Sequence, residues 1–100
     1  MTGIQTLTKE KTKLDEPGLY DVIFLNDNIT TMEFVTRILM QKFGKDHFKA
    51  EKMMLRIHEE GKGIVGSYIH EIAGQKQLEA TLLAEKENFP LKIFIKKQSR

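Results

Sequence analysis

Three consecutive side chains rich in hydrogen-bond acceptors form the first candidate site of this chain. Asn26, Asp27 and Asn28 directly follow an apolar run at 20–25. Carboxylate and amide oxygens held in a fixed turn can accept hydrogen bonds from a cationic group such as an ammonium. The same residue types are also ordinary turn formers, so this stretch taken alone favours a turn that merely ends a strand.

A helix-capping pattern follows this turn. Thr30 and Glu33 have the capping-box spacing, in which the threonine hydroxyl accepts from the backbone N–H of Glu33 and the glutamate carboxylate accepts from the N–H of Thr30. A helix start of this kind would hold the polar residues before it in a fixed arrangement. We therefore expect a helix that begins at about Thr31.

A histidine on an amphipathic segment supplies the second candidate site. Met54, Ile57 and His58 are spaced i, i+3 and i+4, so they project from one face of a helix. The simpler interpretation is a core histidine whose hydrogen-bonding groups are satisfied. Methionine side chains, however, adapt well to the walls of a pocket, and His58 beside Asn26 and Asp27 would form a cluster of acceptors next to an apolar hollow. That combination suits a peptide N-terminus, which carries an ammonium and then an apolar first side chain.

The sequence disfavours three other kinds of site. Residues 61–66 match the pattern GxGxxG, but they follow a helix and open a strand, the reverse of the order that a dinucleotide site needs. His47, His58 and His70 lack a metal-ligand spacing, and the chain has no cysteine. A KH-like RNA-binding fold needs a GXXG loop, and residues 44–47 lack its second glycine. We expect no catalytic residue, no metal and no cofactor.

Hydrophobic periodicity predicts the elements that position these residues. It indicates strands at 20–25, 64–68 and 91–96 and helices at 31–43, 48–60 and 71–86. The inner face of the last helix is expected to carry Ile72, Ala73, Ala80, Leu83 and Ala84. The order strand-helix-helix-strand-helix-strand predicts an α+β fold, a small two-layer sandwich in which a three-stranded antiparallel sheet packs on the helices.

Single residues mark the ends of these elements. Gly44 and Gly61 are typical helix stops, and Asp46 is a typical helix cap. Gly66 inside a strand indicates a bulge or a close approach of the backbone.

Length and composition describe one domain preceded by a tail. One hundred residues allow a single modest core. Residues 1–18 are mostly polar and end in Pro17-Gly18, which predicts a flexible tail before a folded core at 19–100. With no cysteine, no long apolar run and no signal-peptide pattern, we expect a cytoplasmic protein. A net charge of +2 does not by itself indicate nucleic acid.

The order and spacing of these motifs resemble the ClpS family of N-degron adaptors. The resemblance runs from about residue 20 to residue 96 and is carried by Asn26-Asp27-Asn28, residues 30–35, 54–58 and 61–66, and Phe89-Pro90-Leu91. It implies a sandwich like the ribosomal L7/L12 C-terminal domain. It also implies an adaptor, not an enzyme, that binds a free N-terminal Leu, Phe, Tyr or Trp of a substrate. Such an adaptor delivers the substrate to the ClpA–ClpP protease and so modulates its substrate choice.

The resemblance also assigns roles to individual residues. The substrate α-amino group would be held by Asn26, Asp27 and His58, with Asn28 and Thr30 in support. The pocket for the first side chain would be lined by Met32, Val35, Met54, Ile57 and Leu91, with Met32 as the gatekeeper. The contact with the N-terminal domain of ClpA would use Glu71 and Lys76. The tail at 1–18 would assist delivery. The protein would act as a monomer, without nucleic acid or membrane.

Two residues depart from the family pattern. Asn28 stands where the family commonly has Asp, a change expected to weaken the hold on an ammonium by about 1 kcal/mol in a solvated site. Thr31 stands where the family often has Pro, and we expect this change to be harmless. The alternative to the adaptor is a non-degradative interaction domain of L7/L12-like fold that docks through its last helix. Only the adaptor has a reason to require a free α-amine.

Overall fold

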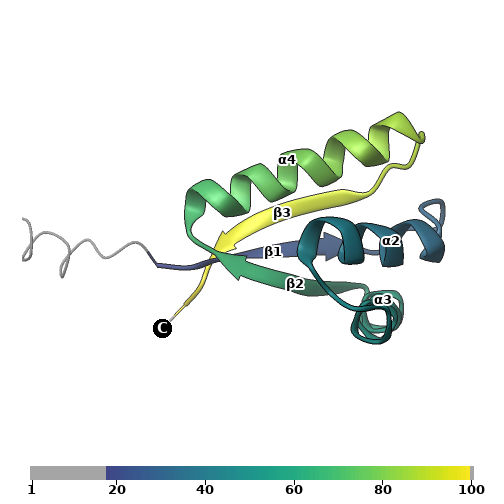
Figure 1. The fold of residues 1–100 in the computed structure, drawn as a ribbon, viewed down its shortest axis with the longest axis horizontal. Helices are drawn as coiled ribbons and strands as arrows, with labels where there is room; N and C mark the ends of the chain where they lie inside the picture. Colours follow the sequence, from purple (N-terminus) through teal and green to yellow (C-terminus); the bar gives the residue numbers. More distant parts are fainter. Residues whose placement is uncertain (1–17, 100) are drawn as a thin grey trace, which may run out of the picture.

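The computed structural model describes residues 18–99 and contains the elements in the predicted order. They are β1 (Tyr20–Leu25), α2 (Met32–Phe43), α3 (His47–Glu60), β2 (Lys62–Tyr68), α4 (His70–Lys86) and β3 (Lys92–Lys97). β1 is the central strand and pairs antiparallel with both β2 and β3. Figure 1 shows α4 lying along β3 and α3 beside β2. The α+β sandwich is therefore confirmed, whereas the tail predicted at 1–18 lies outside the described residues except for Gly18.

One face of the sheet packs on the helices. Val22 and Phe24 in β1 are fully buried, while Ile23 between them points to the other face, because successive side chains of a strand alternate. α2 buries five apolar side chains on one face, namely Phe34, Val35, Ile38, Leu39 and Phe43. α3 buries Ala50, Met54 and Ile57. Each large side chain buried in this way contributes roughly 1.5–3 kcal/mol to the free energy of folding.

α4 packs on the sheet through small residues. Ala73, Ala80 and Ala84 are its buried side chains, and Leu83 is half-buried. The prediction that Ile72 belongs to this inner face is wrong, because its side chain is 39% exposed. Adjacent positions on a helix lie about 100° apart. Ile72 lies in the first turn of α4 and is exposed there, whereas Leu83, directly before Ala84, is half-buried.

The start of α2 differs from the predicted capping box by one residue. The N-cap is Thr31, whose hydroxyl accepts from the backbone N–H of Phe34 at 3.1 Å. The backbone N–H of Thr30 is instead taken by the carboxylate of Asp27 at 2.6 Å, so it is not available to Glu33. The prediction of Thr30 as the cap is therefore wrong by one residue, because the hydroxyl of Thr30 bonds to Asp27 at 2.8 Å.

The predicted ends of the helices are confirmed. The carboxylate of Asp46 accepts from the N–H of Lys49 at 2.8 Å and caps α3. Gly44 and Gly61 end α2 and α3 with φ of 65° and 89°, a left-handed conformation that glycine adopts without steric cost.

β2 carries the predicted bulge and begins earlier than expected. Val22 pairs with Gly66 and Ile23 pairs with Ile64, so one extra residue of β2 lies between these two pairs. The strand begins at Lys62 rather than Ile64 because Gly63 lets its backbone pass close to α3. A Cβ at Gly63 would lie 2.8 Å from Cγ1 of Ile57.

Candidate functional site

The carboxylate of Asp27 organises the loop between β1 and α2. One oxygen accepts hydrogen bonds from the backbone N–H groups of Ile29 at 2.8 Å and Thr30 at 2.6 Å. The other oxygen accepts from the hydroxyl of Thr30 at 2.8 Å. These three bonds form an Asx-type turn that directly precedes the cap of α2. The polar loop is therefore held in shape by one of its own candidate site residues.

The same bonds keep Asp27 charged. Partial burial by itself would raise the pKa of Asp27, but the hydrogen bonds from the Thr30 backbone, the Thr30 hydroxyl and the Ile29 backbone outweigh it and lower the pKa. A carboxylate that accepts several N–H and O–H bonds is stabilised in its ionised form. The loop therefore presents a negative charge at neutral pH and in mildly acidic solution.

The structure brings this loop to the end of α3, which carries the candidate histidine. The backbone N–H of Asn26 donates to the carbonyl of Gly61 at 2.9 Å, and Gly61 is the residue that ends α3. His58 lies in the last turn of that helix. The side chains of Asn26 and His58 are exposed. No hydrogen bond joins His58 to Asn26 or Asp27 within the described part of the chain, and the half-buried carboxylate of Asp27 bonds to its own loop instead.

The expected pocket residues fall into two groups. Four of them are buried and belong to the main hydrophobic core: Val35, Met54, Ile57 and Leu91. Met32 lies at the surface with 45% of its side chain exposed. In this structure the four core members are covered, and only Met32 is freely accessible.

A shallow groove between α2 and α3 joins two of these methionines. It has a volume of about 490 Å³, and its wall includes Met32, Met54 and Met40. Met40 was not among the residues singled out from the sequence. The helical spacing could have identified Met40, because it follows Met32 by eight positions and therefore lies on the same side of α2 about two turns later. Val35, Ile57 and Leu91 do not line this groove.

The two residues expected to contact a partner lie on α4 and differ in accessibility. Glu71 is exposed in the first turn of the helix. Lys76 is half-buried and donates from its Nζ to the backbone carbonyl of Lys42 at 2.7 Å, near the C-terminal end of α2. Its ammonium also lies 5.6 Å from the ring centre of Tyr68. Lys76 therefore ties α4 to the end of α2.

Residues 18–99 contain no cluster of three or more His, Cys, Asp or Glu side chains that could hold a metal ion. None of the helices in that range has both the length and the apolar character that a bilayer crossing requires.

Comparison with known proteins identifies the family. The sequence model of the family described as "ATP-dependent Clp protease adaptor protein ClpS" matches residues 15–94. This chain belongs to the ClpS family. The ATP-dependent Clp protease adapter protein ClpS of Campylobacter jejuni subsp. doylei is 46% identical to it over 95 residues, which cover 95% of this chain and 99% of that ClpS. The ClpS of Desulforapulum autotrophicum is 45% identical over 94 residues, which cover 94% and 90% of the two chains.

A solved ClpS structure shares the fold as well. ClpS2 of Agrobacterium tumefaciens bound to L-phenylalaninamide superposes with a TM-score of 0.80 and 34% sequence identity. The superposition covers 82% of this chain and 99% of the ClpS2 chain. The resemblance inferred from the motifs is therefore confirmed, and the chain is a ClpS adaptor of a Clp protease.

Proposed function

We propose that this ClpS binds the free N-terminal residue of N-degron substrates and delivers them to the ClpA–ClpP protease. The observation that carries the proposal is the ligand of the related ClpS2, L-phenylalaninamide. This molecule has a free α-amine, a large apolar side chain and an amide in place of a carboxylate, so it mimics the first residue of a polypeptide. The preferred first residues are Leu, Phe, Tyr and Trp.

In this proposal Asn26, Asp27 and His58 hold the α-ammonium. An ionised carboxylate offers about four lone-pair positions, and three hydrogen bonds within the loop already occupy Asp27. Asp27 therefore contributes its charge and about one further hydrogen bond. The remaining N–H groups of the ammonium donate to the exposed side chains of Asn26 and His58, and Asn28 and Thr30 support this arrangement.

The first side chain of the substrate enters the apolar region that begins at Met32. Val35, Met54, Ile57 and Leu91 are almost fully covered, so entry requires Met32 and Met54 to change rotamer and open the space between them. Methionine suits this role because its unbranched side chain rearranges at low cost. Burial of a Leu or Phe side chain contributes roughly 1.5–3 kcal/mol to binding, and short β-branched side chains fit less well past Met32.

Delivery uses a surface on α4 and involves no catalytic step. Glu71 is accessible for a contact with the N-terminal domain of ClpA, and Lys76, held by the carbonyl of Lys42, contributes to the same surface from a fixed position. The adaptor acts as a cytoplasmic monomer, and residues 1–18 form the tail that assists transfer of the substrate.

A peptide panel tests the recognition step. Fluorescence anisotropy is measured with labelled peptides that differ only at position one, carrying Leu, Phe, Tyr, Trp, Ile, Gly or acetylated Leu. We expect tight binding of Leu, Phe, Tyr and Trp, weak binding of Ile and Gly, and loss of binding on acetylation. Acetylation removes the charge and leaves acceptors unpaired, at about 1–3 kcal/mol for each buried group.

The panel also distinguishes the proposal from a non-degradative interaction domain that docks through α4. Such a domain would bind free and acetylated peptides equally or bind neither. Degradation of a Leu-initiated protein by ClpA–ClpP, measured with and without this ClpS, then tests delivery. Absence of stimulation would contradict the second half of the proposal.

A further inference from the structure

The positive charge of this chain is concentrated in one cleft between α3 and the sheet. The cleft has a volume of about 770 Å³ and is lined by seven of the 16 Lys and Arg residues of the chain but by only two of its 14 Asp and Glu residues. Its formal charge is therefore +5, and the rest of the chain carries −3. The net charge of the whole chain is thus only +2, although the surface of this cleft is strongly basic.

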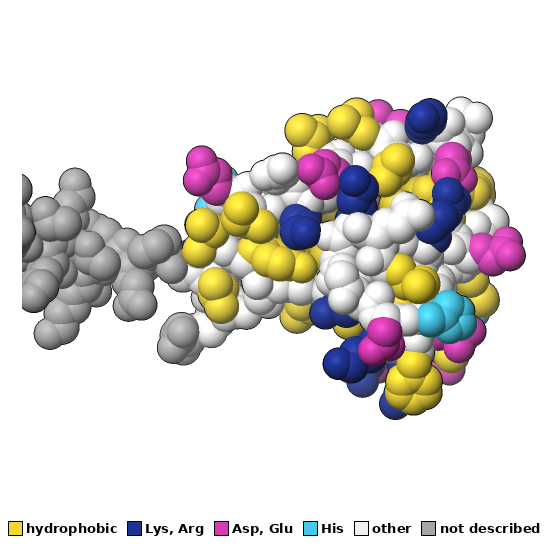
Figure 2. All heavy atoms as spheres, viewed as in Figure 1, with side chains coloured by type: hydrophobic (Ala, Val, Ile, Leu, Met, Phe, Trp, Pro, Cys, Tyr) yellow, Lys and Arg dark blue, Asp and Glu magenta, His cyan; other side chains and the backbone are white. Residues whose placement is uncertain are grey.

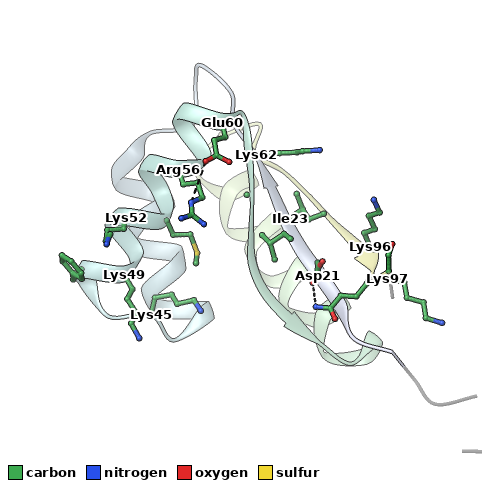
Figure 3. Close-up of a pocket in the computed structure, with 16 residues that line it drawn as sticks. Asp21, Ile23, Lys45, Lys49, Lys52, Arg56, Glu60, Lys62, Lys96 and Lys97 are labelled. Carbon is green, nitrogen blue, oxygen red and sulfur yellow. Dashed lines mark hydrogen bonds and ion pairs between the residues drawn. The ribbon is translucent and has the colours of Figure 1, made fainter. Parts of the chain in front are cut away.

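The basic side chains come from both walls of the cleft. Lys45, Lys49, Lys52 and Arg56 belong to α3 and the loop before it, and Figure 3 shows them on the side opposite the sheet. Lys62, Lys96 and Lys97 belong to β2 and β3 on the other side. In Figure 2 part of this cluster is visible as Lys and Arg side chains over α3, next to exposed hydrophobic side chains.

The acidic residues of the cleft already have partners within the protein. Asp21 accepts hydrogen bonds from the hydroxyl of Ser67 at 2.6 Å and from the amide of Gln98 at 2.8 Å. Glu60 lies 4.0 Å from Arg56, and this pair is exposed. Among residues 18–99, Arg56 is the one basic residue of the cleft that forms a salt bridge. The remaining six cations are accessible to an anionic partner.

Large apolar side chains also line the cleft. Phe48 is 67% exposed and Ile64 is 53% exposed, and both line the cleft together with Ile23 and Met53. Ile64 and Ile23 are cross-strand neighbours on the sheet face that does not carry the core. Exposed apolar groups with a charged rim are typical of interaction sites.

We propose that this cleft binds an acidic linear segment of polypeptide that also carries large apolar side chains. Carboxylates of the segment pair with the lysines of the two walls, and its Leu or Phe side chains cover Ile64, Ile23 and Phe48. A polypeptide fits better than a single-stranded nucleic acid because the apolar lining is mostly aliphatic, whereas sites for single strands use aromatic rings on which bases stack. Asn26, Asp27 and His58 do not line the cleft, so this site is separate from the proposed α-amino site.

The test uses an acetylated eight-residue peptide that alternates Asp or Glu with Leu or Phe. Acetylation prevents use of the α-amino site, so the outcome is independent of the peptide panel described above. Binding to the ¹⁵N-labelled full chain is followed by NMR at low salt. We expect shifts at Lys49, Met53 and Ile64, and affinity at least tenfold higher than for the same peptide with Lys in place of each acid.

Two variants with equal changes of net charge locate the site. Lys49→Glu with Lys52→Glu reverses two cations of the cleft, and glutamate near the start of α3 is compatible with the helix. Lys86→Glu with Lys92→Glu reverses two exposed cations elsewhere. The first variant should bind the acidic peptide about tenfold or more weakly, since two attractive pairs become repulsive. The second variant should retain most of the affinity.

Three results would overturn the proposal. One is the absence of shifts in the cleft at millimolar peptide. Another is an equal loss of affinity in both variants, which would indicate non-specific charge attraction. The third is equal or tighter binding of an eight-nucleotide oligothymidylate at the same residues, which would identify a nucleic-acid surface. Circular dichroism of both variants confirms that each one is folded.

Discussion

Substitution of Asp27 tests the central element of the candidate site. Asp27→Ala removes three hydrogen bonds that hold the loop before α2. A buried bond to a charged group contributes about 1.5–3 kcal/mol, but this carboxylate is partly exposed, and water competes for it, so about 0.5–1 kcal/mol for each bond is realistic. We therefore expect a loss of about 2 kcal/mol at neutral pH.

Asp27→Asn tests the contribution of the negative charge separately from that of the hydrogen bonds in the loop. An asparagine oxygen can still accept from the backbone N–H groups of Ile29 and Thr30, whereas the charge is lost, so the expected cost is about 1 kcal/mol. The pKa of Asp27 is lowered in the folded state relative to about 3.9 in the unfolded chain. Its contribution is therefore complete above the unfolded pKa and disappears as the pH falls through the folded pKa.

The assay is urea unfolding of the wild type and of Asp27→Asn between pH 7 and pH 2.5. The difference in the free energy of unfolding should stay constant from pH 7 to pH 5 and shrink below about pH 4. Asn28→Ala is the matched control, since Asn28 is exposed in the same loop, and it should cost less than about 0.5 kcal/mol. A difference that did not change with pH, or an equal cost in the control, would refute the reasoning.

Three further predictions concern the N-cap of α2, the close approach of β2 to α3 at Gly63, and the role of His58. Thr31→Ala should cost about 1 kcal/mol in urea unfolding and Thr31→Asp should not; equal costs would argue against Thr31 as the N-cap. Gly63→Ala should cost about 1–2 kcal/mol because its Cβ would collide with Ile57. In an Ile57→Ala background that extra cost should vanish, and a double-mutant cycle without coupling would contradict the predicted collision. His58→Ala should abolish binding of a Leu-initiated peptide without lowering the melting temperature, because the ring is exposed. Wild-type affinity should fall in alkali, where the ligand amine is neutral; an unfolded variant, or a folded variant that binds like the wild type, would exclude this role of His58.

Features with a local cause could be predicted from the sequence. Gly44, Gly61 and Asp46 end or begin helices for reasons contained in a few neighbouring residues, and the structure confirms each of them. The acceptor loop at 26–28 was also recognisable. Its shape is set by hydrogen bonds that span at most three residues.

Features that depend on competition or on distant contacts could not be predicted. The cap of α2 is Thr31 and not Thr30, because Asp27 takes the N–H that a capping box would use. Ile72 has the hydrophobicity of a core residue and lies at nearly the same angle around α4 as the half-buried Leu83, yet it is exposed. Periodicity gives the direction of a helix face and does not show which of its turns are covered by the rest of the fold.

The sequence by itself determined the order of the elements, the stops of α2 and α3, the cap of α3 and membership of the ClpS family, because local hydrogen bonding and short motifs carry that information. Only the tertiary structure decided what lies together in space. It joined Asn26 to Gly61 at the end of α3, and it covered most of the expected pocket residues within the core. It also placed basic residues from positions 45–62 together with Lys96 and Lys97 around one cleft, since pairing and packing between distant segments depend on the whole fold.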